Sequence, residues 1–240
     1  METRRSKLVI IPTYNEIENV ENIIRAVFDL EGGYHILIID DASPDGTAEA
    51  VKRLQTEFPD RLSLMQRSGK LGLGTAYIAG FKWALEKGYD YVFEMDADFS
   101  HDPGDLPRLL AACEEGGADL AIGSRYTDGV SVVNWPISRI IMSYYASVYT
   151  RTMLGTKIKD STAGFVCYSR KVLEGIDLDA VRMKGYGFQI EMKYTAVRKG
   201  FKVAEVPVIF VNRKAGTSKM SGSIFGEAFW GVIGLRFRRF

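Results

Sequence analysis

Short apolar runs alternate with longer amphipathic stretches through the first half of the chain. The runs are rich in Ile, Val, Leu and aromatic residues and lie at residues 8–11, 36–39, 62–65, 91–95 and 120–122. Stretches in which apolar positions recur with helical spacing lie among them, at residues 17–30, 47–58, 75–87 and 106–115. Short apolar runs separated by helix-length segments are typical of parallel strands that are buried on both faces. The pattern therefore predicts an α/β fold with a doubly wound, mainly parallel, Rossmann-like sheet and peripheral amphipathic helices.

The second half of the chain is less regular. Tyr- and Met-rich residues 136–154 and residues 188–197 are predicted to be helices, and residues 203–211 a strand. Pro207 favours a sheet edge for that strand, because proline has no N–H to donate to a neighbour. Residues 212–223 form a predicted Gly/Ser/Lys loop, and residues 224–240 are apolar and aromatic and end in arginines.

Length and charge restrict the class of protein. A chain of 240 residues fits one α/β domain with a tail, here divided as residues 1–223 and 224–240. The net charge of +1 gives no reason to expect nucleic acid as a partner. Two cysteines, far apart in sequence and outside any metal-ligand spacing, speak against a disulfide framework and a structural zinc site and favour a reducing, cytoplasmic setting.

Polar residues follow three of the predicted strands directly. Residues 12–16 follow the first strand, Asp40 and Asp41 end the second, and Asp96 and Asp98 end the fourth. Doubly wound sheets bind ligands beyond the carboxyl ends of their strands, so this order alone predicts a site there.

Asp96 and Asp98 are the strongest local signal for chemistry. Two carboxylates two residues apart can bind one hard cation, Mg²⁺ or Mn²⁺, which would in turn bridge a diphosphate. The alternative is a solvated turn that caps a helix. The position of the pair after an apolar run, together with a second acidic pair at Asp40 and Asp41, favours the metal site.

Two further segments border the predicted site. Asp41 is predicted to bind a base or ribose, although the sequence that follows it is also strong turn chemistry, in which Asp45 or Thr47 could cap a helix. Both roles can hold together. The glycine-rich residues 69–74 lack a Walker A pattern and predict a close-packed turn. His101 is predicted to support the site rather than to act as a base.

These motifs together resemble the dolichol-phosphate (polyprenol-phosphate) mannose synthases, within the inverting family-2 glycosyltransferases of GT-A fold. The sequences Lys-Leu-Gly-Leu-Gly-Thr-Ala-Tyr at residues 70–77 and Lys-Gly-Tyr-Gly-Phe-Gln-Ile-Glu-Met at residues 184–192 are the most specific part of the resemblance. Further matching segments lie in the expected order at residues 12–16, 39–47, 95–103, 123–126 and 210–219. Many relatives append membrane helices that this sequence lacks.

The resemblance implies a role for individual residues. Donor-binding residues would be Pro12, Tyr14, Glu16, Ile39, Asp41, Asp96, Ala97, Asp98, Arg125, Arg213 and Lys219. The acceptor phosphate would meet Arg125, Arg139 and Ser143, and the catalytic set would be Asp96, Asp98 and Arg125. The metal would be held by Asp96 and Asp98, with Ser100 at a position where some relatives carry a glutamine ligand.

The implied activity is transfer of mannose from GDP-mannose to a polyprenyl (dolichyl-type) phosphate with inversion. A phosphate monoester already carries negative charge at neutral pH, so the nucleophile needs no dedicated base. Cations that offset the repulsion between two anions would be needed instead. The alternatives are a polyprenyl-phosphate glucosyltransferase that uses UDP-glucose, and a nucleotide-binding protein without turnover.

The end of the chain is predicted to meet the membrane surface. Its apolar stretch, residues 224–235, would reach about 18 Å as a helix, short of a hydrocarbon core of about 30 Å. Aromatic rings beside arginines suit the interface, which predicts peripheral attachment to the cytoplasmic face. The alternative is a helix packed on the protein's own core or on a small membrane-embedded partner.

Overall fold

The structure is a computed structural model and describes residues 5–183, 185–212 and 222–238. The strands are β1 (Lys7–Thr13), β2 (Tyr34–Asp40), β3 (Leu62–Gln66), β4 (Tyr91–Glu94), β5 (Leu120–Ser124), β6 (Val132–Val133), β7 (Val166–Ser169), β8 (Val203–Pro207) and β9 (Phe210–Val211). The α-helices are α1 (Val20–Phe28), α2 (Thr47–Glu57), α3 (Leu73–Lys87), α4 (Leu106–Glu114), α5 (Ile137–Leu154), α6 (Arg170–Gly175), α7 (Gly185–Arg198) and α8 (Gly222–Phe237). Two short 3₁₀ turns lie at Pro103–Asp105 and Leu178–Ala180.

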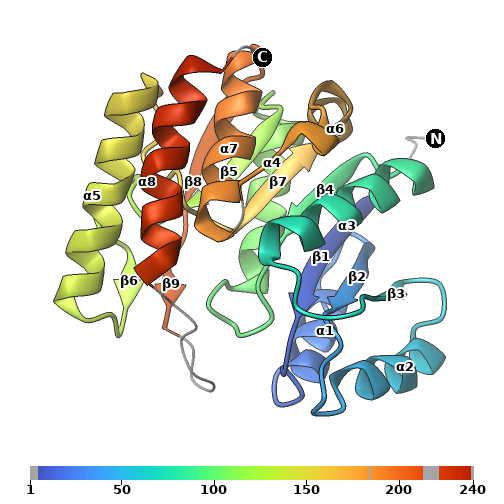
Figure 1. The fold of residues 1–240 in the computed structure, drawn as a ribbon. Coiled ribbons are helices and arrows are strands. Elements are labelled where there is room, and N and C mark those ends of the chain that lie inside the picture. The colour runs from blue at the N-terminus through green and yellow to red at the C-terminus, as the bar shows by residue number, and fades with distance from the viewer. Residues whose placement is uncertain (1–4, 184, 213–221, 239–240) are drawn as a thin grey trace.

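A mainly parallel sheet forms the centre of the molecule, as the alternating pattern predicted (Figure 1). Its strands lie in the order β3-β2-β1-β4-β7-β5-β8. β7 runs antiparallel to both of its neighbours, β4 and β5, whereas the other pairs in this sheet are parallel. β6 and β9 form a second, two-stranded sheet.

Helices cover both faces of the large sheet, which is the doubly wound arrangement. Side chains of α1, α2 and α4 pack on one face, and those of α3, α6 and α7 pack on the other. The central strands β1 and β2 are buried on both faces, and their alternate side chains enter opposite clusters. The predicted fold class is therefore confirmed.

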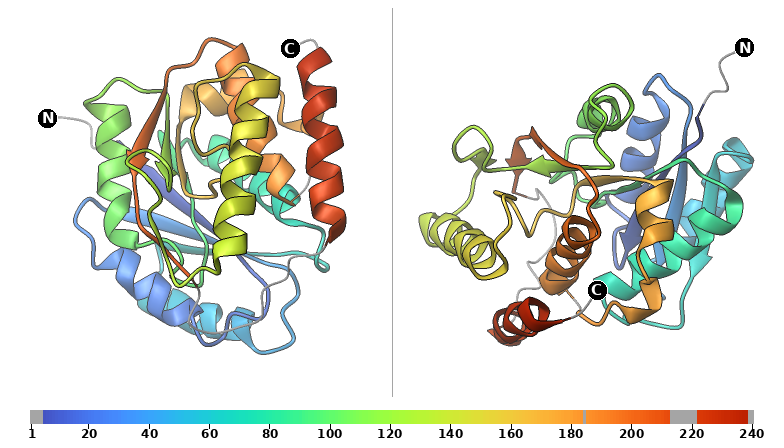
Figure 2. Two further views of the ribbon diagram at one scale, coloured as in Figure 1. Left: turned by 90° about the vertical axis from the view of Figure 1, so that its left-hand side faces the viewer. Right: turned by 90° about the horizontal axis from the view of Figure 1, so that it is seen from above.

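A third cluster joins the two long helices of the second half to the rest of the protein. Leu154 of α5, Ile190 and Tyr194 of α7, and Val232 and Leu235 of α8 are buried against one another. Figure 2 shows α5 and α8 running side by side, outside α7. The C-terminal segment thus packs on the protein's own core along one face. Among the described helices, none combines the length and apolar composition needed to cross a bilayer.

The sequence prediction for the second half contained one wrong strand and missed two elements. The strand expected at residues 203–211 is two strands, because β8 ends at Pro207 after pairing with β5, and β9 pairs with β6 instead. β8 lies at the sheet edge, as Pro207 predicted. β7 and α6 were not predicted. Their residues form a run too short for its apolar spacing to distinguish a strand from a helix.

Candidate active site

Loops that follow β1, β2 and β4 meet at one edge of the sheet. β1 lies between β2 and β4 and runs parallel to both, so their carboxyl ends lie together. Thr13 pairs in register with Asp40, and Pro12 with Ile39, which places two predicted donor-binding residues side by side. The Asp41 N–H donates to the Thr13 carbonyl at 3.0 Å and ties the first two loops together.

The remaining predicted residues of the first loop are also fixed by neighbours. The Tyr14 ring lies 5.2 Å from the Lys70 ammonium, which brings the glycine-rich turn over this loop. The Glu16 N–H donates to Thr47 Oγ1 at 3.0 Å, and its carboxylate accepts the Asn19 amide at 2.9 Å. Tyr14 and Glu16 thus lie at the edge of the sheet where Asp41 lies.

Three residues in these loops adopt a backbone conformation that side chains rarely take. Asn15, Ala42 and Phe99 have φ values of 57°, 56° and 57°, and they follow β1, β2 and β4 respectively. Each such residue costs about 1–3 kcal/mol and persists only where its surroundings hold it. The Asn15 N–H, for example, donates to Ser43 Oγ at 3.0 Å. All three loops at this edge thus share an uncommon backbone conformation that neighbouring groups hold, which agrees with the site predicted there.

The two aspartates at the end of β2 have different surroundings. Asp40 is fully buried and accepts hydrogen bonds from the Thr13 hydroxyl and from the N–H and hydroxyl of Ser43, so it holds the turn. Asp41 forms a two-point ion pair with Arg67, at 2.6 and 2.7 Å. Asp40 therefore holds the turn, whereas Asp41 has a carboxylate that Arg67 keeps in a fixed orientation.

The turn after Asp41 starts α2 as the sequence suggested. Asp45 Oδ1 accepts the N–H and the hydroxyl of Thr47, the first residue of α2, and its second oxygen accepts the Ile17 N–H at 3.1 Å. Asp45 thus satisfies an N–H at the start of the helix and joins the loops after β1 and β2.

The close-packed turn predicted at residues 69–74 holds only at Gly74, which already belongs to α3, because Gly69 meets no atom within 4 Å and Leu71 is exposed. A Cβ on Gly74 would lie 2.9 Å from the Phe188 ring, closer than real side chains approach. Gly74 thus allows α3 to lie against α7 at the border of the site.

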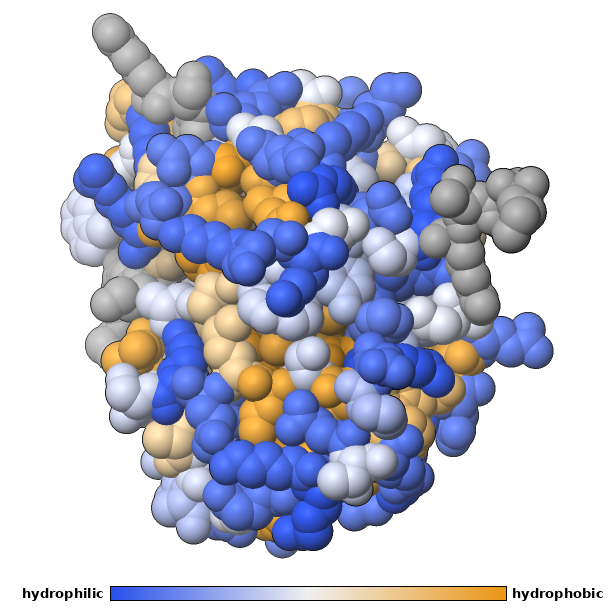
Figure 3. Space-filling model, turned by 90° about the vertical axis from the view of Figure 1, so that its right-hand side faces the viewer, coloured by the Kyte–Doolittle hydropathy of each residue, from blue (hydrophilic) through white to orange (hydrophobic). Residues whose placement is uncertain are grey.

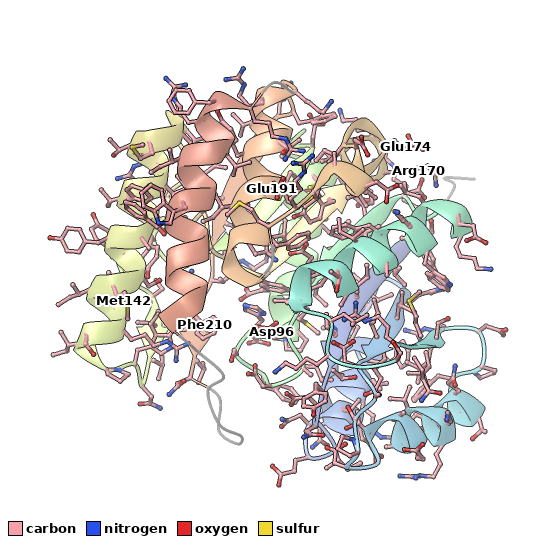
Figure 4. All side chains as sticks on the ribbon, viewed as in Figure 1. Asp96, Met142, Arg170, Glu174, Glu191 and Phe210 are labelled. Atoms are coloured by element: carbon pink, nitrogen blue, oxygen red, sulfur yellow. The ribbon has the colours of Figure 1, made fainter. Side chains whose placement is uncertain are left out.

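Asp96 and Asp98 follow β4 on a tight turn. The Asp96 side chain is 39% exposed and lines the cavity described below. Asp98 is buried, and its Oδ1 accepts the Ser100 N–H at 3.0 Å. Ser100 is buried beside them and also lines the cavity. Figure 4 shows Asp96 between the strands of the first half and helices α5 and α8.

His101 supports this turn from behind. The Asp96 N–H donates to His101 Nδ1 at 3.3 Å, which requires an unprotonated Nδ1. The imidazole stacks on Phe165 at 4.9 Å. Burial lowers the pKa of His101 to about 4. The ring is therefore neutral at physiological pH and holds the backbone of Asp96, in agreement with the supporting role predicted from the sequence.

The predicted oxygen donors suit a hard divalent cation. Among the described residues no group of three or more His, Cys, Asp or Glu side chains could hold a metal by itself. Mg²⁺ commonly binds through one or two carboxylates and completes its coordination with substrate phosphates and water. The pair of Asp96 and Asp98 fits that mode of binding.

Arg125 follows β5 and reaches the same cavity, but its charge is paired. Its Nε and Nη2 donate to the two oxygens of Asp160 at 2.7 and 2.6 Å, and its backbone N–H donates to Oδ2 at 3.0 Å. Nη2 also donates to Thr162 at 2.8 Å. The aromatic rings of Trp135 and Phe210 lie within 5.7 Å of the guanidinium. Arg125 is thus a rigid, neutralised cation in the cavity wall.

The predicted acceptor-phosphate residues Arg139 and Ser143 lie one turn apart on α5. The Arg139 guanidinium lies 4.0 Å from the centre of the Trp135 ring and donates to Asn212 Oδ1 at 3.1 Å. Ser143 Oγ accepts the Tyr126 hydroxyl at 2.7 Å. Both line the cavity together with Arg125, so the structure brings the three predicted residues to one space.

That cavity has a volume of about 710 Å³ and extends from Asp96 between α5, α7 and α8. Its polar lining includes Asp96, Ser100, Arg125, Arg139 and Ser143. Later turns of α5, together with α7 and α8, add an apolar and aromatic lining that includes Tyr145, Tyr149, Ile190, Phe229 and Val232. A single space therefore joins the Asp96 carboxylate and two arginines to an apolar chamber.

A buried polar network lies behind the cavity and was not predicted. Gln189 of α7 lines the cavity, donates to Glu94 at 2.5 Å and accepts from Lys193 at 3.0 Å. The Lys193 ammonium also donates to the carbonyls of Ser161 and Ala163, at 3.2 and 2.5 Å. Burial raises the pKa of Glu94 to about 8 and lowers that of Lys193 to about 8. The network joins β4, α7 and the loop that carries Asp160.

The predicted residues Arg213 and Lys219 lie outside the described residues, as does most of the loop at 212–223. The residues of the candidate site that the sequence analysis missed are Arg67, Asp160 and Gln189. Arg67 and Asp160 lie in segments without periodicity, so no local signal reveals their partners. Gln189 lies inside the motif at residues 184–192, and that motif was the available signal.

Comparison with known proteins identifies the family. The model of the family described as Glycosyl transferase family 2 matches residues 8–177. The chain belongs to this family. It is 51% identical over 232 residues to a polyprenol monophosphomannose synthase of Mycolicibacterium smegmatis, with 95% of this chain and 87% of that protein covered. It is 48% identical over 240 residues to an undecaprenyl-phosphate mannosyltransferase of Micrococcus luteus, with 96% and 98% covered. These relatives confirm the resemblance to the polyprenol-phosphate mannose synthases.

Solved structures agree on the fold. The glucosyl-3-phosphoglycerate synthase of Mycobacterium tuberculosis, in a complex with Mn²⁺, UDP-glucose and phosphoglyceric acid, superposes with a TM-score of 0.70 at 18% identity. The match covers 97% of this chain and 80% of that one. The likeness at this level of identity shows that the GT-A fold of the family is shared.

Proposed function

We propose that this family 2 glycosyltransferase transfers mannose from GDP-mannose to a polyprenyl phosphate, with inversion at the anomeric carbon. The observation that carries the proposal is the cavity that joins Asp96 to an apolar chamber between α5, α7 and α8. A polyprenyl phosphate has a matching form, with a dianionic head and a long apolar chain. The two relatives, whose names specify polyprenyl substrates and mannosyl transfer, support this choice of acceptor and sugar.

The nucleotide would lie over the loops after β1 and β2, near Tyr14, Glu16 and Asp41. None of these three lines the cavity, whereas Asp96 does. The diphosphate would therefore bridge the two spaces at Asp96 and Asp98, with the sugar directed into the cavity. Arg213 and Lys219 remain proposed contacts of the diphosphate.

Asp96 and Asp98 would hold a divalent cation, Mg²⁺ or Mn²⁺, with Ser100 beside them. When bound, the cation neutralises charge on the departing diphosphate. Residues of the chain perform the remaining tasks. Arg139 and Ser143 would orient the acceptor phosphate, whose oxygen attacks the anomeric carbon from the side opposite the diphosphate.

Arg125 contributes less net charge than a lone arginine would, because Asp160 pairs with it. Its place in the cavity wall would therefore be to provide a fixed, ion-paired group beside the acceptor phosphate rather than bulk positive charge. His101 would not serve as the base, because its Nδ1 already accepts the Asp96 N–H. The acceptor needs none, because its phosphate is already ionised.

The cavity wall also continues to the molecular surface through exposed apolar residues. On α5, Ile137, Ile141, Met142, Tyr144 and Tyr145 are exposed, and on α8 Phe229, Trp230 and Phe237 are exposed. On the opposite side of the molecule hydrophilic residues cover most of the surface, with apolar residues between them (Figure 3).

We therefore propose that residues 224–240 serve as a membrane-interface segment on the catalytic domain 1–223. The α5 and α8 side would lie against the cytoplasmic face of the membrane, where aromatic rings insert shallowly beside headgroups.

The test is transfer of labelled sugar to undecaprenyl phosphate in detergent, with GDP-mannose and UDP-glucose compared. We expect mannosyl transfer with GDP-mannose, its loss in EDTA and its return with Mg²⁺ or Mn²⁺. Asp98→Asn should lower turnover by at least about a hundredfold. Asp60→Asn is the control, because Asp60 is exposed before β3, at the other end of the strands. Glucosyl transfer alone, or full activity in EDTA, would overturn the donor or the metal assignment respectively.

A further inference from the structure

Arg67 connects three parts of the nucleotide side of the site. It directly follows β3, and its backbone N–H donates to the Asp40 carbonyl at 2.8 Å. Its Nε and Nη2 donate to the two oxygens of Asp41 at 2.6 and 2.7 Å. Its Nη1 donates to Thr75 Oγ1 at 2.8 Å, and that hydroxyl donates to the Gly72 carbonyl at 2.7 Å. Arg67 therefore ties the end of β2 to the glycine-rich turn before α3.

This arrangement fixes the orientation of the Asp41 carboxylate. A guanidinium fork that contacts both oxygens holds the plane of a carboxylate as well as its position, which a lysine cannot do. Both side chains are only 10% exposed, so neither is free to sample other rotamers in water. An ionised carboxylate can accept about four hydrogen bonds. The fork takes two, so each Asp41 oxygen keeps acceptor capacity for a ligand.

We propose that Arg67 is a positioning residue for the nucleoside half of the donor, and that it acts by holding Asp41 toward N–H or O–H groups of the base or ribose. The proposal rests on the proposed function, which places the nucleotide over these loops. Arg67 need not touch the nucleotide. Asp41 binds the nucleoside directly. Because its carboxylate is already oriented, binding does not require a further loss of side-chain conformational entropy.

The role is confined to one end of the donor. Arg67 contacts Asp41, Thr75 and Gly72, whereas the diphosphate is assigned to Asp96 and Asp98 after β4, on the other side of β1. Loss of Arg67 should therefore weaken ligands that carry a nucleoside and spare ligands that consist of phosphate alone. A merely structural role would weaken both.

The experiment measures GDP and inorganic pyrophosphate binding to the full chain by calorimetry, with Mn²⁺ present throughout. We expect Arg67→Gln to weaken GDP binding about tenfold or more and to leave pyrophosphate binding unchanged. Arg67→Lys should recover little of this loss, because it restores the charge without the fork.

Arg25→Gln is the matched control. Arg25 makes a similar two-point pair with Glu57, at 2.6 and 2.8 Å, on the exposed surface of α1 and α2. That variant should bind both ligands as the wild type does. Unchanged GDP binding in Arg67→Gln, or equal weakening of GDP and pyrophosphate, would overturn the positioning role. Failure of the wild type itself to bind GDP would instead overturn the proposed function on which it rests.

Discussion

Replacement of Asp160 by asparagine tests the buried ion pair in the cavity wall. The Asp160 carboxylate is fully buried and accepts three hydrogen bonds from Arg125, two from the guanidinium and one from the backbone. Asparagine has nearly the same shape but no charge, and its amide group would present N–H donors to the N–H donors of Arg125. Arg125 would then remain buried without the counter-charge that Asp160 supplies.

The expected loss of stability is large. Removal of one partner of a buried ion pair costs about 3–5 kcal/mol. With a denaturant dependence of about 3 kcal/mol per M in urea, the unfolding midpoint should fall by roughly 1–1.7 M. Glu174→Gln is the control. It breaks the exposed Arg170–Glu174 pair on α6, which Figure 4 shows well away from Asp96. Such a pair contributes about 0.3–0.5 kcal/mol, so its midpoint should shift by less than about 0.2 M.

The same pair predicts a pH dependence. Burial alone would raise the pKa of Asp160, but the charge and hydrogen bonds of Arg125 outweigh it and hold the pKa below its usual range. A lowered pKa stabilises the folded protein above the unfolded value of about 3.9 and loses that contribution as pH falls through the folded value. The difference between wild type and Asp160→Asn should therefore be full at pH 7 and shrink below about pH 4. A midpoint shift under about 0.3 M at pH 7 would refute the reasoning.

Three further variants test the surroundings of the site. Gly74→Ala forces a Cβ to within 2.9 Å of Phe188 and should lower stability by about 1–3 kcal/mol in thermal melting, whereas Gly69→Ala, which meets no atom within 4 Å, should not. The Trp230 side chain is 70% exposed, so Trp230→Ser should leave the melting temperature unchanged and weaken binding to anionic liposomes severalfold. Equal sedimentation of wild type and variant with the liposomes would show that Trp230 is not part of the membrane contact. Glu191→Gln removes the charge that pairs with Arg238, just after α8, and should weaken the attachment of α8 to α7 by about 1–3 kcal/mol, seen as faster proteolysis near the C-terminus. Unchanged cleavage would show that this ion pair does not hold α8.

The order of elements in the first half was predictable, because helix and strand periodicity is a local property. Strands β1 to β5 and helices α1 to α4 each lie within a few residues of the predicted ranges. The position of Asp96 and Asp98 followed from the same pattern, since a carboxyl end of a parallel strand is known once the strand is known. The edge position of β8 followed from the chemistry of one residue, Pro207.

Only the tertiary structure revealed which distant residues meet. β7 enters the sheet between β4 and β5, although it follows both in sequence, and no local pattern encodes that order. Arg125 and Asp160 are 35 positions apart, and Gln189 and Glu94 are 95 apart. Each of these polar groups reads as a surface residue in sequence, because the partner that allows its burial is supplied by another element.

The acceptor side of the site depends on the same kind of long-range contact. Sequence alone indicated a Tyr- and Met-rich helix at residues 136–154 and an apolar, aromatic segment at residues 224–240, without showing that the two lie side by side. The packing of α5 and α8 around α7 leaves a cavity between them beside Asp96. A cavity is the space that several elements leave unfilled, so it exists only once their relative positions are set. The carboxylates could therefore be predicted from the sequence, whereas the apolar chamber beside them could not.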